Sequence, residues 1–110
     1  MSDFQSLQGI FEAAQRIQVE MARVKAELGE KIVSAETGGG LVTCTANGKG
    51  DLVSLAVEPT LLAADSKKML EDLVVGAVNL ALERARQLAQ DEIAKATGGL
   101  PLPPGLFGGQ

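Results

Sequence analysis

The sequence predicts an α+β protein in which a long helix, a three-stranded antiparallel meander and a second long helix follow one another. Three observations predict this fold: a heptad stripe of apolar residues near the start, a middle rich in Val and Thr that is broken by glycine turns, and a second helical stretch. The chain has 110 residues, the length of one domain. We place the domain at residues 1–97 and a Gly- and Pro-rich tail, expected to be flexible, at 98–110.

The first predicted helix runs from Asp3 to Leu28, with Ser2 or Asp3 as its N-cap and Gly29 as a left-handed residue at its end. Its apolar residues recur at alternating steps of three and four, a period that helices keep when they wind along another helix. We therefore expect a narrow seam that meets a second long helix of the same subunit or of its partner. The seam consists of Leu7, Ile10, Ala14, Ile17, Met21, Val24 and Leu28.

Three short strands are predicted at 31–37, 41–46 and 52–57, each with alternating or β-branched residues. Glycines 38–40 connect the first two strands. The run from Asn47 to Asp51 forms a hairpin turn, because Asn and Gly accept the positive φ angles of tight turns. The strands should form an antiparallel meander with one buried face.

The second long helix is predicted from about Lys67 to Ala96, after Pro59 has ended the third strand and Asp65 or Ser66 has capped the helix. Its early half should cover the sheet, while its later and more charged half projects. At about 1.5 Å per residue each helix spans roughly 35–45 Å, so helix ends should overhang the small sheet. A chain of this size covers two such helices most easily by homodimerisation.

Little in the sequence suggests catalysis. The chain has no His, which excludes Ser-His and Cys-His catalysis and the common His-based zinc sites. The only cysteine, Cys44, lies in the middle of a predicted strand, as a small buried residue would, and it suits a reducing compartment. Neither glycine run fits a phosphate-binding loop. We therefore expect no enzyme, no catalytic residue, no metal, no cofactor, no small-molecule substrate and no membrane span, and a cytoplasmic location.

The basic residues suggest a different kind of site. Arg16 and Arg23 are seven residues apart and share one face of the first helix, and Arg84 and Arg86 lie in the later part of the second helix. If the helix ends overhang, these cations could line one forked surface that contacts DNA phosphates without reading bases. The alternative is a solvated face on which Arg16 pairs with Glu20 and Arg23 with Glu27 at i,i+4. The net charge of −4 argues against the strongly basic surface expected of a nucleic-acid binder, although the local arrangement of charges matters more than their total.

Three stretches resemble the YbaB/EbfC family of bacterial nucleoid-associated proteins: GGGLVTCTANGKGDLVSLAVEP, the helix start KKMLEDLVVGAVNLALERA after a preceding LL pair, and GGLPLPPGLF. The resemblance implies a homodimer with projecting helices and binding of double-stranded DNA in the nucleoid with little sequence preference, which would organise the chromosome and could modulate transcription. Lys49 matches the lysine of the family's hairpin turn, whereas Thr43 and Ala56 stand where the family often has cations. The DNA contacts that the resemblance implies fall on Arg16, Arg23, Lys25, Arg84 and Arg86.

Two functions follow from the sequence. The first is non-catalytic binding of DNA through its phosphates. The second is a protein-interaction module, in which an acidic helical dimer binds another protein. The negative net charge and the two missing strand cations favour this second function.

Overall fold

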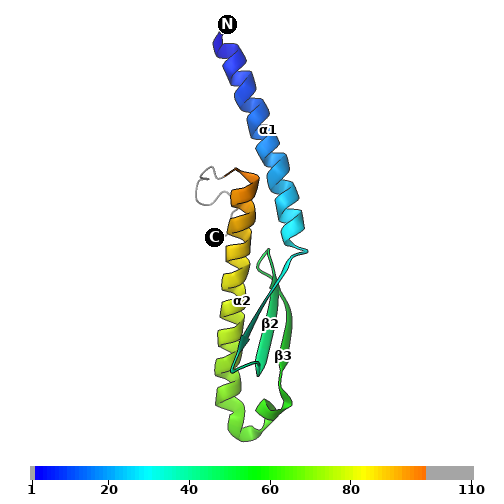
Figure 1. The fold of residues 1–110 in the computed structure, drawn as a ribbon, viewed down its shortest axis with the longest axis vertical. Coiled ribbons are helices and arrows are strands. Elements are labelled where there is room, and N and C mark those ends of the chain that lie inside the picture. The colour runs from blue at the N-terminus through cyan, green and yellow to red at the C-terminus, as the bar shows by residue number, and fades with distance from the viewer. Residues whose placement is uncertain (1, 99–110) are drawn as a thin grey trace.

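The computed structural model describes residues 2–98, with side chains from residue 6 onward. It is one elongated unit of 77 × 21 × 18 Å with a radius of gyration of 20.1 Å, where a compact chain of about 100 residues would have about 13 Å. Figure 1 shows a single long helix that rises well beyond the rest of the molecule. The elements are α1 (Ser2–Leu28), β1 (Ile32–Thr37), β2 (Val42–Asn47), β3 (Leu52–Val57), two 3₁₀ turns (Pro59–Leu62 and Ala64–Ser66) and α2 (Lys67–Ala96).

The predicted order of helix, three strands and helix is confirmed, with boundaries within one residue. Two local expectations were wrong. Gly29 follows α1 without a positive φ, so no left-handed glycine ends that helix. Ser66 precedes α2 without a capping hydrogen bond from its side chain, because a 3₁₀ turn already leads the chain into the helix. The tail from residue 99 onward lies outside the described residues.

The sheet has the order β1–β2–β3, and both pairs of neighbouring strands are antiparallel. The central strand alternates buried and half-buried residues, with Val42, Cys44 and Ala46 fully buried. Against this face α2 places Ala77, Ala81 and Ala85, whose small side chains let the helix lie close to the sheet. Cys44 is therefore a core residue, as its strand position predicted.

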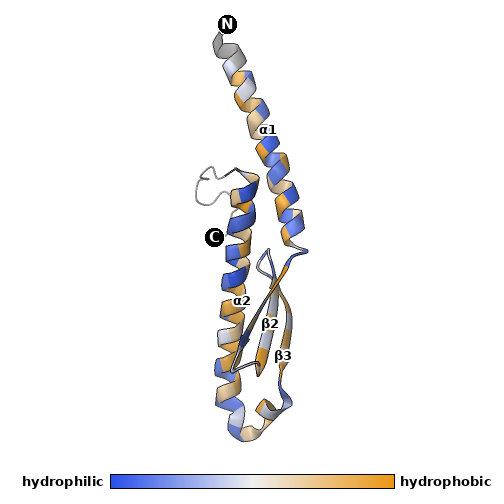
Figure 2. Cartoon of the chain, viewed as in Figure 1, coloured by the Kyte–Doolittle hydropathy of each residue, from blue (hydrophilic) through white to orange (hydrophobic). Residues whose placement is uncertain are grey.

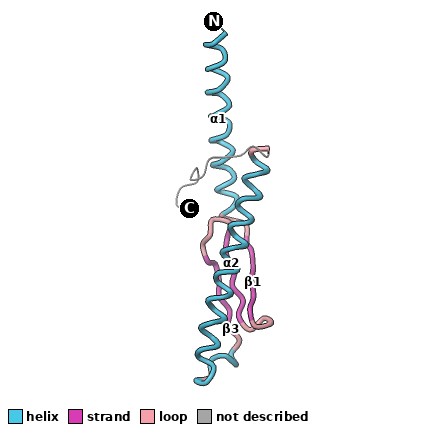
Figure 3. Tube along the Cα trace, turned by 90° about the vertical axis from the view of Figure 1, so that its left-hand side faces the viewer, coloured by secondary structure: helices cyan, strands magenta, loops and turns pink. Residues whose placement is uncertain are grey.

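Helix α2 covers β1 and β2 but leaves β3 largely uncovered (Figures 1 and 3). Leu55 pairs with the buried Cys44 and so belongs to the face that carries α2, yet 49% of it is exposed. Val53 and Leu52 of the same strand are 54% and 49% exposed. The third strand thus presents an apolar surface that this chain does not bury, so the expectation that the sheet has one buried face is wrong for β3.

The seam of α1 is covered over only its last two turns. Met21, Val24 and Leu28 are buried, whereas Leu7, Ile10 and Ile17 are 54%, 63% and 40% exposed. Apolar residues recur along the coloured part of α1 in Figure 2, including the part that extends beyond α2. One chain therefore buries fewer than half of the apolar residues that form the seam of α1.

The hairpin turn between β2 and β3 holds the end of α1 in place. The side-chain Oδ1 of Asn47 accepts hydrogen bonds from the backbone N–H groups of Lys49 and Asp51 at 2.9 and 3.1 Å, and Gly50 takes a φ of +90°. The backbone N–H of Gly48 then donates to the carbonyl oxygen of Leu28 at 2.8 Å. This contact joins the last residue of α1 to the sheet.

We predict that Gly48→Ala destabilises the protein while Gly9→Ala does not. A Cβ at Gly48 would lie 2.8 Å from the carbonyl oxygen of Leu28 and 2.7 Å from the Cδ2 atom of the Leu28 side chain. The end of α1 would therefore have to move. We expect a loss of about 1–3 kcal/mol in the free energy of unfolding, as for other overpacked sites. A Cβ at Gly9 meets nothing within 4 Å, and alanine there should add about 0.5–1 kcal/mol.

Urea unfolding of the two variants measures both effects. Equal midpoints for Gly48→Ala and the unchanged protein would show that the turn does not fix α1.

Candidate nucleic-acid interface

A cavity lies where the end of α1, the β2–β3 turn and the second half of α2 meet. Its volume is about 380 Å³. Three cations from these three elements line it: Lys25 of α1, Lys49 of the turn and Arg86 of α2. Leu28, Ala89 and Ile93 supply its apolar part. We call this space, with its three cations, the wedge cavity.

The wedge cavity brings together two of the five cations predicted to contact DNA, Lys25 and Arg86, and adds Lys49. The sequence marked Lys49 only as a turn residue. The position of Lys49 at this cavity follows only from the fold. The hairpin turn lies against the end of α1, and the aliphatic part of the Lys49 side chain lies over Gly29.

The two arginines of α2 do not share one surface. They are two residues apart, and such positions on a helix point in nearly opposite directions. Arg84 donates a hydrogen bond to the carbonyl oxygen of Ser34 in β1. Arg86 lies at the wedge cavity and pairs with Glu83 at 2.7 Å. Arg84 is thus held at the first strand, away from the other predicted contacts.

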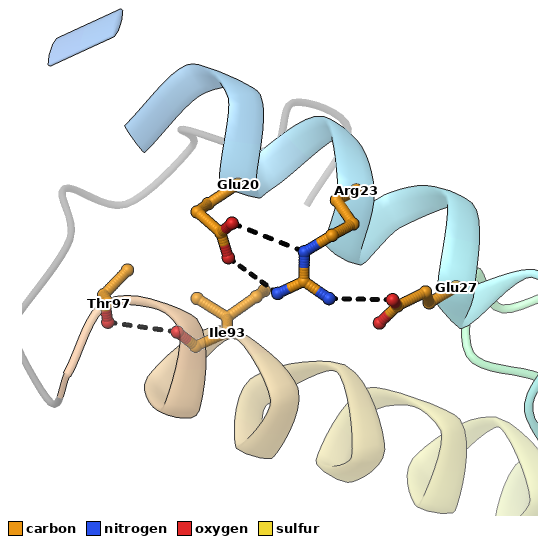
Figure 4. A network of polar contacts seen from close by, with 5 residues as sticks. All are labelled: Glu20, Arg23, Glu27, Ile93 and Thr97. Atoms are coloured by element: carbon orange, nitrogen blue, oxygen red, sulfur yellow. Dashed lines mark hydrogen bonds and ion pairs between the residues drawn. The ribbon is translucent and has the colours of Figure 1, made fainter. Parts of the chain in front are cut away.

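Arg23 is held between two carboxylates of its own helix, as Figure 4 shows. Its guanidinium bonds Glu20 at 2.6 Å and Glu27 at 2.7 Å. The hydrogen bond to Glu20, with a smaller contribution from Glu27, raises the pKa of Arg23, and the same bond lowers the pKa of Glu20. The Arg23–Glu27 pairing expected at i,i+4 is therefore present, and it neutralises this cation locally.

Arg16 is different from Arg23. In the part of the chain that the structure describes it forms no ion pair, so the expected pairing with Glu20 is absent. It lines a shallow hollow with Ile17 and Met21 of α1 and with Ala96 at the end of α2. Arg16 therefore marks the height at which α2 ends, and everything before it on α1 extends beyond the body of the molecule (Figures 1 and 3).

One ion pair ties the start of the sheet to the second helix. Lys31, just before β1, bonds Glu92 of α2 at 2.9 Å, and Lys95 lies 3.7 Å from the same carboxylate. Glu92 has only 18% of its side chain exposed. The hydrogen bond from Lys31 lowers the pKa of Glu92 against the opposing effect of its partial burial, with a smaller contribution from Lys95. This pair joins the segment between α1 and β1 to α2, and the backbone N–H of Gly48 donates to the carbonyl oxygen of the same Lys31 at 3.0 Å.

The described residues hold no group of three or more His, Cys, Asp or Glu side chains that could bind a metal ion. Among the helices of residues 2–98, none is long and apolar enough to cross a bilayer. The wedge cavity gathers positive charge from three elements, which suits binding of an anionic partner.

Comparison with known proteins points to DNA. The sequence pattern of the YbaB/EbfC DNA-binding family matches residues 3–100. A nucleoid-associated protein of Acetivibrio thermocellus is 42% identical over 102 residues, which cover 93% of this chain and 90% of the relative. One from Anaeromyxobacter sp. (strain Fw109-5) is 44% identical over 97 residues, with 88% and 94% covered. The crystal structure of an uncharacterized protein from Helicobacter pylori shares the fold, with a TM-score of 0.70 at 22% identity over 86% of this chain and 97% of that one.

We predict that the Lys31–Glu92 pair makes stability depend on pH at the acid end. Because folding lowers the pKa of Glu92, the stability it contributes is fully present above the ordinary glutamate pKa of about 4.3. That contribution is lost as the pH falls through the lowered pKa. Glu92→Gln should therefore flatten the pH dependence of the urea midpoint in this acid range.

Lys31→Gln serves as the matched control, because it keeps the carboxylate and removes its main partner. The pKa of Glu92, followed by carboxyl carbon NMR, should rise in this variant. An unchanged titration of Glu92 would show that the pair does not form in solution.

Proposed function

The chain belongs to the YbaB/EbfC DNA-binding family, and from the cations at its wedge cavity and along α1 we propose that it binds double-stranded DNA through the phosphates. Membership of a DNA-binding family confirms the prediction that the protein is not an enzyme. The single observation that carries the proposed mode of binding is the meeting of Lys25, Lys49 and Arg86 from three separate elements. Cations gathered in this way can contact phosphates without reading base edges.

The proposed role is that of a nucleoid-associated protein, as the relatives are named. The protein would bind many sequences with similar affinity, organise the chromosome in the cytoplasm and, by occupying DNA, modulate transcription. Arg16 extends the cationic surface along α1. We assign Arg23 and Arg84 smaller parts, because the carboxylates of Glu20 and Glu27 and the carbonyl of Ser34 already hold them.

We further propose that the protein acts as a homodimer. Two apolar surfaces support this proposal: the uncovered part of the α1 seam at Leu7, Ile10 and Ile17, and the uncovered strand β3. A second copy could cover both with the same residues, as a two-fold interface requires. Two copies would then present paired projecting helices and twice the cations.

The alternative function, a module that grips a protein, has one observation in its favour. Arg23 is held by two glutamates, so it adds little positive charge to this part of α1. The two functions differ in their salt dependence, which the following prediction measures.

We predict that Lys25→Gln/Lys49→Gln weakens DNA binding equally on unrelated duplexes. Each cation that no longer meets a phosphate should reduce the steepness of log affinity against log salt by about 0.9. Lys67→Gln/Lys68→Gln is the matched control, because it removes the same charge at the opposite end of α2, away from the wedge cavity. Fluorescence anisotropy over a range of salt concentrations measures both.

Equal weakening by the two double variants would mean that only total charge matters. A duplex affinity that does not respond to salt would favour the protein-interaction module.

We predict that Ile10→Gln/Ile17→Gln shifts the protein toward monomer, because both residues belong to the seam. Phe11→Gln/Val19→Gln is the matched control: these side chains lie on the same helix and are 69% and 68% exposed, but they are off the seam. Light scattering coupled to size-exclusion chromatography should give a lower mass for the seam variant alone. A dimer mass that survives the seam change would place the interface elsewhere.

A further inference from the structure

The wedge cavity has the size of a small-molecule site. Its volume of about 380 Å³ lies within the range of roughly 300–1,000 Å³ that is typical of ligand pockets. A DNA backbone that runs over the surface would meet the cations at its mouth. It would not fill the apolar space behind them, because the bases of a duplex are stacked and cannot enter.

The lining combines two kinds of contact. Lys25, Lys49 and Arg86 supply positive charge, and among the described residues that line the cavity there is no carboxylate. Leu28 is buried and Ala89 and Ile93 are half-buried, so they form an apolar floor. Figure 4 shows the side chain of Ile93 between the two helices, on the side of α2 that faces α1.

Gln90 adds a neutral amide to the same cavity, with two donors and one acceptor oxygen. Arg86 is engaged with Glu83, but the two side chains are 55% and 63% exposed. An ion pair that exposed stabilises little and exchanges its partner readily. The guanidinium of Arg86 can therefore turn to a phosphate, which it binds through two parallel N–H donors.

We propose that the wedge cavity binds a free nucleoside monophosphate. The phosphate would lie among Lys25, Lys49 and Arg86, the flat base would pack on Leu28 and Ile93, and the polar edge of the base would meet the amide of Gln90. Inorganic phosphate uses only the cations, and an aliphatic anion leaves the amide unpaired. A nucleotide is the class of anion that matches all three parts of the lining. It is a ligand here, without a reaction.

This proposal is tested without DNA, so that its outcome stands apart from the DNA-binding proposal. Adenosine 5′-monophosphate is titrated into the ¹⁵N-labelled full chain at constant ionic strength, and the amide signals of Gly48, Lys49 and Gln90 are followed. We expect saturable shifts with a Kd of about 1 mM or below. Adenosine and inorganic phosphate, titrated separately, should bind at least about tenfold more weakly, because each makes only part of the contacts.

Two variants and a control locate the ligand. Ala89→Leu fills the cavity with a good helix former and should weaken binding of the nucleotide at least about tenfold. Arg86→Gln should weaken it as well, and it keeps the test valid if the larger side chain disturbs α2. Ala94→Leu is the matched control, because Ala94 is exposed on the same helix and does not line the cavity.

Three results would overturn the proposal: no saturable shift with the nucleotide, equal shifts with inorganic phosphate, or equal effects of Ala89→Leu and Ala94→Leu. Equal shifts with inorganic phosphate would show that the three cations bind the phosphate group and that the apolar floor of the cavity contributes nothing to binding.

Discussion

The constraint on which the structure depends is an apolar stripe that is longer than the surface available to cover it. The seam of α1 runs from Leu7 to Leu28, but α2 ends near Ala96, beside Arg16 and Met21. Of the seven seam residues, only Met21, Val24 and Leu28 are therefore buried within the chain. Burial of apolar area is the main stabilising force in folding, and the uncovered half of α1 leaves apolar area that the proposed second copy would bury. The exposed residues of β3 leave further apolar area uncovered in the sheet.

The direction of α1 follows from a small junction rather than from a broad interface. The hydrogen bond from Gly48 to Leu28 and the Lys31–Glu92 ion pair connect the end of α1 and the residues after it to the β2–β3 turn and to α2. Between them the two helices diverge, and the wedge cavity lies in the angle. The same junction thus projects α1 from the body and gathers Lys25, Lys49 and Arg86 at one place. A cationic surface of this kind arises in an acidic chain because charges are placed locally, whatever their total.

The fold could be predicted from the sequence because its signals were local and repeated: a 3.5-residue period, alternating strands and a turn built from Asn47 to Asp51. The site was harder to predict. The two-residue spacing of Arg84 and Arg86 already turns them to different sides of the helix, but only the structure shows that Arg84 bonds to Ser34 while Arg86 lies at the wedge cavity. For Arg23 the sequence left two interpretations open, a DNA contact and a pair with Glu27, and the structure shows Arg23 bonded to both Glu20 and Glu27. Lys49 joined the site through contacts between segments far apart in the sequence, which no local pattern reports.

Hydrogen exchange along α1 tests the central claim most directly. If a second copy covers the seam, the amides of residues 7–19 should be protected in concentrated solution to a degree close to that of the buried turns of α2. Their protection should fall on dilution, while that of α2 stays the same. Exchange of residues 7–19 as fast as in an isolated helix at every concentration would contradict the claim, because the stripe would then have no partner.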